Sequence, residues 1–484
     1  MRLVLDGNIS KTYVQSLCMM FFPGERFPEN EENPKGTISV KAIEGERGIE
    51  CFCELIYDGK RENGHSFQPF SDFNSYKRTA KTAVGVAIYE AGAKLTEKDF
   101  PWGILTGIRP SKIGAELLES YSYEKSLEIL TKKYMLSESK ARLTLAVAKN
   151  ETEILNKYDE TTCSLYISIP FCPTRCEYCS FISYATKKLF DLIPSYLIKL
   201  KADIKEKLDI ICELGLKLCC IYVGGGTPTT LNESQLDDLL GFVCKNVDTR
   251  KLDEFTVECG RPDTITKEKL EVLKKYGVGR ISVNPQTLND EVLKKIGRKH
   301  TVDEFFSAYK LVDDAKIEVV NTDLIVGLDG DNFESFKKTV DRIINLDPEN
   351  ITVHAFSIKK SAKALENDRE IYKKENNFAQ SSELYAYRTL LDNNYVPYYM
   401  YRQKNTVNNL ENVGYAKMGT FGIYNVLMMS DEHTVFSAGA GATTKLYKKI
   451  NGKSEIFRIF SQKYPYEYLQ NDKESKNTII EFYK

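Results

Sequence analysis

Short apolar runs alternate with longer amphipathic stretches through the middle of the chain. From Leu165 onward, runs rich in valine, isoleucine and aromatic residues are separated by segments whose apolar positions recur at helical spacing. This alternation predicts βα units around a parallel sheet. The predicted strands are Leu165 to Ile169, Cys219 to Val223, Phe255 to Glu258, Arg280 to Val283, Val319 to Val326 and Ile351 to Ala355. Two of the intervening helices are predicted at Phe190 to Leu214 and Asp290 to Ile296.

Six βα units predict an α/β fold, a partial (β/α)6 TIM-like barrel rather than a closed eight-stranded one. Functional groups of such barrels lie at the C-terminal ends of the strands and in the loops that follow. Because 484 residues exceed the usual size of one hydrophobic core, further domains are expected. We predict an N-terminal α+β accessory domain at residues 1–160, the barrel at 161–366 and a C-terminal α+β extension at 367–484.

The flanking regions carry local signals of their own. A hairpin is predicted from Thr37 to Asp58 and a helix from Lys77 to Ala93, followed by helices rich in lysine and glutamate up to about Lys157. In the C-terminal region, a strand pair is predicted near Tyr424 to Phe436, followed by a turn at Gly439-Ala440-Gly441. These signals indicate mixed α and β structure on both sides of the barrel.

Composition and charge narrow the functional classes. The chain is 42% apolar and 28% charged, as is typical of a folded globular protein, and its 67 basic and 68 acidic residues create no net field for nucleic acid or anionic membranes. The apolar stretch from Cys18 to Phe22 is too short for a membrane span and lacks the features of a signal peptide. Twelve cysteines are scattered up to Cys259, unlike a secreted disulfide framework. We therefore expect a cytoplasmic protein with no nucleic-acid partner and no membrane insertion.

Three cysteines follow the first predicted strand directly. They lie in the sequence Tyr166-Ile-Ser-Ile-Pro-Phe-Cys172-Pro-Thr-Arg-Cys176-Glu-Tyr-Cys179. Three thiolates on one loop can ligate three irons of a cubane, whereas a fully protein-ligated 4Fe–4S cluster has four cysteine ligands. The spacing therefore predicts a 4Fe–4S cluster with one iron open to a small molecule.

Zinc is the first alternative, because clustered cysteines commonly bind structural zinc. Tetrahedral zinc needs a fourth ligand at a similar spacing, and neither a second CxxC nor a paired histidine follows the triad. Redox disulfide exchange is the second alternative, but no thioredoxin-like unit surrounds Cys176 and Cys179. The open cluster is the favoured interpretation.

A glycine run ends the second predicted strand, in the sequence Tyr222-Val-Gly224-Gly225-Gly226-Thr227-Pro228-Thr229. Glycine lets a backbone approach a ligand closely because no Cβ intervenes, although a structural turn explains such a run about as well. The spacing is neither a dinucleotide fingerprint nor a phosphate loop. Since the run lies one strand from the triad, we expect it to cradle the amino-acid end of S-adenosylmethionine (SAM).

These motifs resemble those of the radical SAM family of oxygen-independent coproporphyrinogen III dehydrogenases, the HemN-like proteins, and most closely their HemZ branch. Further segments with this resemblance extend from the N-terminal region to the C-terminal region. They are Thr106-Gly-Ile-Arg109-Pro, Val257-Glu258-Cys-Gly-Arg261-Pro-Asp263, Tyr401-Arg402-Gln-Lys404-Asn405 and Asn412-Val-Gly414-Tyr415-Ala416.

The resemblance implies two cofactors, a 4Fe–4S cluster on Cys172, Cys176 and Cys179, and SAM. It also implies a set of SAM-contacting positions at or after the strand ends. These are Tyr166, Tyr178, Gly225, Gly226, Thr227, Glu258, Gln286, Arg298, Asp323 and Ala355. For Glu258, Gln286 and Asp323 taken singly, the alternative is a solvated strand end. For Arg298 it is a helix-end cation favoured by the dipole.

The implied activity is oxidative decarboxylation of propionate side chains of coproporphyrinogen III to vinyl groups, giving protoporphyrinogen IX in anaerobic porphyrin and haem biosynthesis. The implied partners are this tetrapyrrole substrate and an unidentified low-potential electron donor. We expect no dedicated general acid or base. Arg402 and Lys404, within an aromatic stretch, are the predicted contacts to substrate carboxylates. The alternative is an amphipathic strand from which both side chains point to solvent.

One departure keeps other functions open. Proven dehydrogenases of the HemN type resemble a triad followed by Gly-Cys, whereas Ser180-Phe181 follows Cys179 here. That replacement also resembles the haem chaperones called HemW. A haem-binding delivery protein, or another radical SAM reaction on a tetrapyrrole, therefore stays as an alternative.

Overall fold

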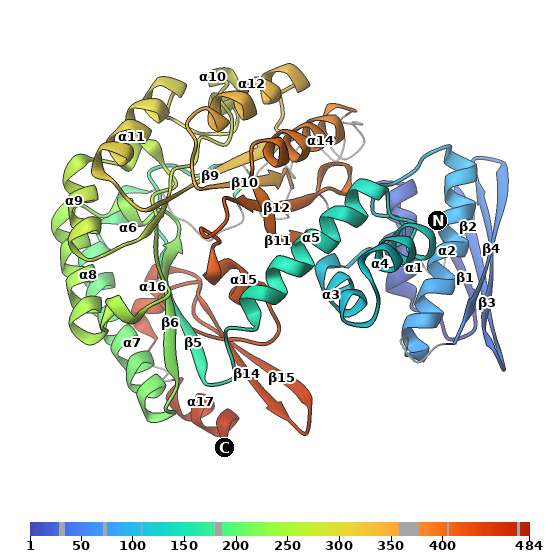
Figure 1. The fold of residues 1–484 in the computed structure, drawn as a ribbon, viewed down its shortest axis with the longest axis horizontal. Helices are drawn as coiled ribbons and strands as arrows, with labels where there is room; N and C mark the ends of the chain where they lie inside the picture. Colours follow the sequence, from blue (N-terminus) through green and yellow to red (C-terminus); the bar gives the residue numbers. More distant parts are fainter. Residues whose placement is uncertain are drawn as a thin grey trace. The chain divides into compact units, whose positions relative to one another are not determined.

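The computed structural model describes residues 1–28, 34–70, 75–107, 109–176, 178–179, 186–357, 377–403, 406–471 and 475–484 (Figure 1). The described residues form two units, Met1–Lys149 and a larger unit that begins at Asn150. The boundary lies within one helix, α5 (Glu138–Leu155).

A four-stranded sheet and its helices form the N-terminal unit. The strand order is β1 (Arg2–Asp6), β2 (Gly36–Gly45), β3 (Gly48–Tyr57) and β4 (Lys60–Pro69), with β1 parallel to β2 and the others antiparallel. Helix α2 (Tyr76–Thr96) packs against β3 and β4, and α1 (Lys11–Phe21) packs against α2. The unit continues through α3 (Pro110–Ser120) and α4 (Tyr123–Glu128). The predicted hairpin and the predicted helix are confirmed.

An eleven-stranded sheet forms the larger unit, in the order β11-β12-β10-β9-β8-β7-β6-β5-β13-β14-β15. Its centre consists of the predicted strands, which all run parallel. These strands are β5 (Thr162–Ile169), β6 (Lys217–Gly225), β7 (Glu254–Glu258), β8 (Arg280–Ser282), β9 (Val319–Val326) and β10 (Asn350–Ala355). The predicted partial barrel is confirmed, and it does not close because β11 and β15 are sheet edges.

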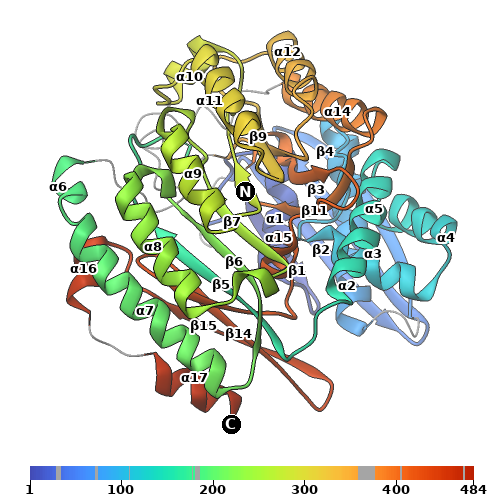
Figure 2. The same cartoon turned by 60° about the vertical axis from the view of Figure 1, so that its left-hand side comes forward.

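Helices that follow these strands in the sequence cover the outer side of the curved sheet (Figure 2). They are α6 (Lys187–Phe190), α7 (Ile193–Glu213), α8 (Glu233–Asn246), α9 (Lys267–Lys275), α10 (Asp290–Lys295), α11 (Val302–Ala315), α12 (Phe333–Ile344) and α14 (Asn377–Asp392). Capping boxes of Asn232 with Gln235 and of Thr301 with Glu304 determine where α8 and α11 begin. No helix within the described residues is both long enough and apolar enough to cross a membrane.

The C-terminal region extends the sheet on both sides. β11 (Val396–Arg402) and β12 (Glu411–Ala416) join beside β10, while β13 (Thr434–Ala438), β14 (Thr443–Ile450) and β15 (Lys453–Phe460) join beside β5. Two helices, α16 (Pro465–Gln470) and α17 (Lys476–Tyr483), follow.

The predicted strand pair near Tyr424 to Phe436 is wrong in its first half, which is the helix α15 (Ile423–Met429). A short apolar run is compatible with either structure, and tertiary contacts decide between them. The buried ammonium of Lys445 donates to the carbonyl oxygens of Leu427, Met428 and Ser430, which stabilises the C-terminal end of this helix. The second half is the strand β13, and the predicted turn follows it.

Candidate active site

The three cysteines of the predicted cluster lie on the loop after β5. Cys172 and Cys176 are buried and Cys179 is half-buried, and none of the three forms a disulfide bond. The backbone amide of Cys179 donates to the carbonyl oxygen of Cys176 at 3.2 Å, so the loop turns sharply there. Residues 177 and 180–185 lie outside the described part of the chain.

The predicted glycine cradle packs directly on this loop. The amides of Gly226 and Thr227 donate to the carbonyl oxygens of Ile169 and Phe171, each at 2.8 Å. A Cβ on Gly226 would lie 2.5 Å from the Phe171 oxygen, and Gly225 has a φ of +108°, which disfavours other residues. The run therefore fixes the end of β6 against the start of the cysteine loop. The Thr227 hydroxyl reaches the loop too, 3.3 Å from the sulfur of Cys172.

Gly226→Ala should lower the free energy of unfolding by about 1–3 kcal/mol, because the added methyl group displaces the backbone of Phe171. Gly279→Ala is the matched control, since its Cβ would meet only Glu318 at an ordinary 3.5 Å. Chemical unfolding of both variants measures the difference. Equal stability of the two variants would contradict the close approach.

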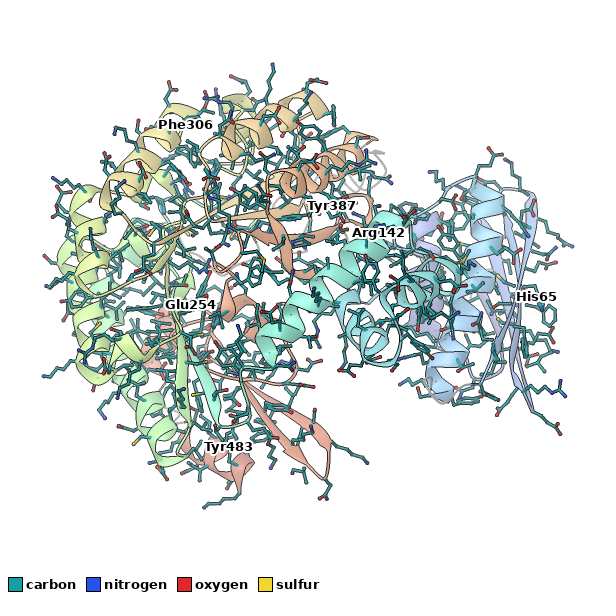
Figure 3. The ribbon with its side chains drawn as sticks, viewed as in Figure 1. His65, Arg142, Glu254, Phe306, Tyr387 and Tyr483 are labelled. Atoms are coloured by element: carbon teal, nitrogen blue, oxygen red, sulfur yellow. The ribbon has the colours of Figure 1, made fainter. Side chains whose placement is uncertain are left out.

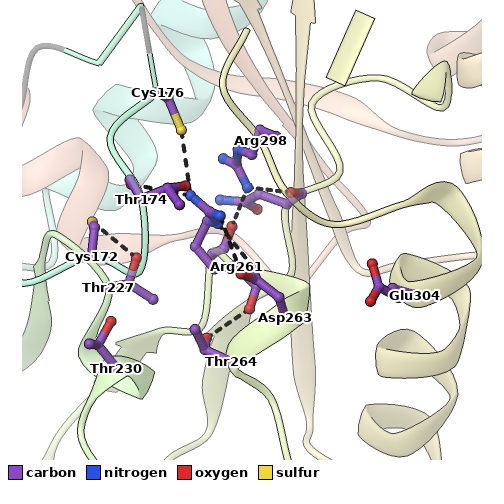
Figure 4. A network of polar contacts seen from close by, with 12 residues as sticks. Cys172, Thr174, Cys176, Thr227, Thr230, Arg261, Asp263, Thr264, Arg298 and Glu304 are labelled. Atoms are coloured by element: carbon purple, nitrogen blue, oxygen red, sulfur yellow. Dashed lines mark hydrogen bonds and ion pairs between the residues drawn. The ribbon is translucent and has the colours of Figure 1, made fainter. Parts of the chain in front are cut away.

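Two buried arginines, Arg261 and Arg298, lie close to the other side of the cysteine loop (Figure 4). Arg261, after β7, donates to the sulfur of Cys176 at 3.7 Å and to the carbonyl oxygen of Thr174 at 3.4 Å. Arg298, after α10, donates to the carbonyl oxygens of Gly260 at 2.9 Å and Asn284 at 3.1 Å. The predictions included Arg298 as a site residue, but they assigned no role to Arg261.

Arg298 also connects to the triad. Its Nε and Nη2 donate to the hydroxyl oxygen of Tyr178 at 3.1 and 3.0 Å, and Tyr178 lies between the second and third cysteines. Arg298 is only 9% exposed, so its side chain points into the protein rather than to solvent at the helix end. The structure thus brings Arg298 and Tyr178 together at the cysteine loop.

Partly accessible side chains occur in the C-terminal halves of five central strands. They are Tyr166 on β5, Tyr222 on β6, Glu258 on β7, Asp323 on β9 and His354 on β10. Tyr166, Asp323 and Glu258 were predicted, whereas Tyr222 and His354 were not. All five lie toward the C-terminal ends of their strands, where a barrel of this class carries its chemistry.

Glu258 lies in a cluster of aromatic rings. The hydroxyl of Tyr222 donates to its Oε1 at 2.6 Å, and the ring of Tyr222 stacks on that of Tyr424 at 4.4 Å, with Tyr166 stacked on both. Burial and, more weakly, the negative charge of Asp323 raise the pKa of Glu258 to about 7. The carboxyl therefore changes its charge near neutral pH.

Glu254, labelled in Figure 3, begins β7 at the end opposite to Glu258. It is ion-paired with Arg280 at 3.4 Å and accepts from the backbone amide of Ile423 at 2.7 Å. These contacts connect the barrel to the start of α15. The two acidic residues of this strand therefore differ in role, and Glu258 is the one at the C-terminal end, where the site lies.

Asp323 is held by several neighbours. Asn321 and Asn284 donate to its two oxygens at 2.7 and 2.8 Å, and the Nε2 of His354 lies 3.7 Å away. Burial alone would raise its pKa, but the hydrogen bonds and the nearby His354 outweigh this and hold the pKa below the ordinary range. On its other side, His354 lies 3.5 Å from the Tyr401 hydroxyl. Asp323 therefore carries a negative charge beside Glu258.

At the two remaining predicted SAM positions, Gln286 and Ala355, the backbone amides make hydrogen bonds within the fold. Gln286 is 4% exposed with a φ of +70°, and its amide donates to the carbonyl oxygen of Asp323 at 3.1 Å. Such a φ is strained for a residue with a side chain, which is typical of functional sites. Ala355 is buried, and its amide donates to the side chain of Asn412 at 3.1 Å.

The structure describes only one of the two predicted substrate contacts, Arg402. Lys404 lies outside the described residues. Arg402 is 4% exposed, so it does not point to solvent, and it donates to the carbonyl oxygen of Asn409 at 3.3 Å. Burial lowers its pKa to about 10, which leaves it charged at neutral pH. Because neighbours on a strand face opposite ways, Arg402 lies on the side of β11 away from Tyr401 and His354.

The donor set of the loop fits an iron–sulfur cluster. Across the ranges that the structure describes, no group of three or more Cys, His, Asp or Glu side chains is close enough to hold one metal ion. A cubane does not need this, because each cysteine ligates a different iron. Three cysteine side chains without disulfide bonds on one loop, with the Thr227 hydroxyl and the Arg261 guanidinium at two of the sulfurs, suit such a cluster.

Comparisons with known proteins agree with this geometry. A family model described as the radical SAM superfamily matches residues 166–343, which include the cysteine loop and the strands through β9. The oxygen-independent coproporphyrinogen-III oxidase-like protein HemZ of Bacillus subtilis is 36% identical over 456 residues, which cover 92% of this chain and 90% of HemZ. The chain therefore belongs to the radical SAM enzyme superfamily, in the family of HemZ. The superfamily uses a 4Fe–4S cluster and SAM, which confirms the two predicted cofactors.

Other relatives match a smaller part of the chain. The haem chaperone HemW of Bacillus subtilis is 34% identical over 198 residues, or 40% of this chain and 51% of HemW. Among solved structures, coproporphyrinogen III oxidase (HemN) from Escherichia coli superposes with a TM-score of 0.51 at 21% identity, covering 67% of this chain and 71% of HemN. At that identity the superposition supports the fold alone.

Proposed function

We propose that the chain is a radical SAM oxidoreductase that oxidatively decarboxylates propionate side chains of coproporphyrinogen III to vinyl groups, giving protoporphyrinogen IX. The observation that carries this proposal is the similarity to HemZ, which extends far beyond the barrel into both flanking regions. The cysteine loop and the glycine run packed against it support the radical SAM chemistry that this activity requires. We further propose that the protein acts in the cytoplasm and receives electrons from a low-potential donor.

In this proposal, Cys172, Cys176 and Cys179 each hold one iron of the cluster. The residues proposed for SAM are Tyr166, Tyr178, Gly225, Gly226, Thr227, Glu258, Gln286, Arg298, Asp323 and Ala355. When bound, the cluster and SAM supply a primary carbon radical that can remove a hydrogen atom from a nearby C–H bond.

The protein's own task is placement and exclusion of water. The glycine run at the end of β6 lets the backbone lie close to the cysteine loop. Arg298 is held by two backbone carbonyl groups and in turn holds the hydroxyl of Tyr178, so the position of this ring is fixed beside the triad. The stacked rings of Tyr166, Tyr222 and Tyr424 form an apolar wall around Glu258. These residues orient ligands, and none of them needs to transfer a proton.

Arg402 and Lys404 are proposed to bind propionate groups of the substrate, which for Arg402 requires that a propionate reaches the side of β11 away from Tyr401. Arg402→Ala should then weaken the use of coproporphyrinogen III by about 1.5–3 kcal/mol, the worth of one charge-assisted hydrogen bond. Cluster content and SAM binding should stay unchanged, as they should in the control Arg388→Ala, which removes an exposed arginine of α14. Thermal unfolding is measured alongside, because Arg402 is buried. Lower stability with an unchanged KM would make Arg402 a structural residue.

The proposed activity is tested by anaerobic incubation of the cluster-loaded protein with SAM, dithionite and coproporphyrinogen III. Mass spectrometry should detect loss of carbon dioxide from the substrate and gain of vinyl groups. Cleavage of SAM without any change in the tetrapyrrole would contradict this activity.

Haem delivery is the second candidate, and two observations favour it. The barrel matches HemW, and Ser180-Phe181 replaces the Gly-Cys pair after the triad. Titration with haem would then show tight, stoichiometric binding in the same protein that leaves coproporphyrinogen III unconverted.

A further inference from the structure

Arg261 occupies an unusual position behind the cysteine loop. It is 3% exposed and comes three residues after Glu258, in the loop that follows β7. Its Nε and Nη2 donate to the two oxygens of Asp263 at 3.1 and 3.3 Å. Its third nitrogen, Nη1, is directed at the loop, where it donates to the sulfur of Cys176 and to the carbonyl oxygen of Thr174. The paired contact with Asp263 thus holds the guanidinium fork and aims one arm at a thiol (Figure 4).

A nearby pair shows that the Asp263 contact alone does not explain this burial. Arg250 also pairs with an aspartate two residues away, Asp248, at 2.8 and 3.2 Å. That arginine lies before β7 and its side chain is 88% exposed. An arginine–aspartate pair at this spacing therefore forms in solvent without difficulty. Desolvating Arg261 costs free energy, which its contacts to the loop help to offset.

Among the described residues, two buried cations lie close to Cys176. Arg261 and Arg298 are both buried on this side of the loop, and Asp263 is the acidic partner of the first. Burial and the positive charges of the two arginines lower the pKa of the buried His300 to about 3, so this histidine is neutral. A cluster on this loop would therefore lie next to two buried guanidinium groups, one of them paired with Asp263.

We propose that Arg261 is a positioning residue that raises the reduction potential of the cluster through its hydrogen bond and charge at Cys176. The inference rests on the proposed role of Cys176 as an iron ligand. Reduction adds one electron to the cluster and spreads negative charge over its sulfur ligands. A buried cation that donates to one of these sulfurs stabilises the reduced form more than the oxidised form. The role is therefore to help the cluster accept an electron from its donor.

The experiment compares wild type, Arg261→Met, Arg261→Lys and Arg250→Met after anaerobic loading with iron and sulfide. Iron and sulfide content is measured first, and the midpoint potential is then obtained by titration with dithionite, followed by electron paramagnetic resonance. In Arg261→Met, the ratio of reduced to oxidised cluster at a given poise should fall about tenfold, which is a shift of about 59 mV to lower potential for one electron. Arg250→Met should equal wild type.

Arg261→Lys keeps the charge but loses the planar fork that Asp263 holds, so its midpoint should fall by a smaller amount. If Arg261→Met does not fold, the midpoint potential of Arg261→Lys alone tests the inference. Unchanged midpoints in the Arg261 variants that load a cluster would overturn the inference and leave Arg261 with a structural role only. Failure of the wild type to hold a 4Fe–4S cluster would instead overturn the proposed function, so the two failures are distinguishable.

Discussion

Replacing Cys176 by alanine should abolish the stable 4Fe–4S cluster. Cys176 lies at the centre of the loop, and it is the triad sulfur to which Arg261 donates. Loss of one of three protein ligands leaves two irons without a cysteine and exposes the cluster to loss of iron. After anaerobic reconstitution, the variant should contain little iron or sulfide, lack the broad visible absorption of the cluster and leave SAM uncleaved.

Cys212→Ala is the control for this variant. Cys212 is an exposed cysteine of α7, outside the triad, and its removal should leave iron content unchanged. Circular dichroism of both variants checks that the fold persists. Full iron content and SAM cleavage by Cys176→Ala would show that Cys176 is not an essential ligand of the cluster.

SAM binding should depend on the ionisation of Glu258. The pKa of this carboxyl is about 7, above the 4.5 of an ordinary glutamate, so it is mostly neutral at pH 6 and mostly ionised at pH 8. If the ionised form contacts the cationic or hydroxyl groups of SAM, the affinity should rise by about tenfold over this range, in proportion to the ionised fraction. Anaerobic calorimetry with the cluster-loaded protein measures the dissociation constant at each pH.

Glu258→Gln provides the comparison. This variant should bind SAM more weakly at pH 8 and should lose the part of the pH dependence that belongs to the protein, while the ionisation of SAM itself persists in both. A raised pKa stabilises the fold below pH 4.5, and this contribution is lost as pH rises through 7. The variant should therefore be no less stable than wild type at pH 8. Identical affinities of the two proteins at pH 8 would remove Glu258 from the SAM site.

Most of the barrel could be predicted because its signals are local. The central strands contain short runs of β-branched and aromatic residues, and in β5 every residue except Tyr166 is buried. The helix starts are equally local, since Asn232 and Thr301 cap helices through residues three positions later. The cysteine triad is local too, because all three ligands fall within one loop. Contacts of this kind follow from sequence spacing alone.

Predictions were weakest where several structures suit the same residues. The run from Ile423 to Met429 is short and apolar, and it is a helix because Lys445 binds its last carbonyl groups and Tyr424 stacks on Tyr166 and Tyr222. The direction of the Arg402 side chain was equally hard to predict, because its position in the sequence suits either face of a strand. Its burial depends on the packing of β11 against β12.

By itself, the sequence determined the order of the βα units, the cysteine ligand set and the glycine run, because short-range spacing and periodicity define each of them. Only the tertiary structure decided which side chains surround the loop. Arg261 and Cys176 are 85 residues apart, and they meet because β5 and β7 are both neighbours of β6 in one sheet, with their C-terminal ends at the same edge. Tyr222, Glu258, Asp323 and His354 meet for the same reason. Such contacts depend on strand order and register, which the free energy of packing the whole sheet determines.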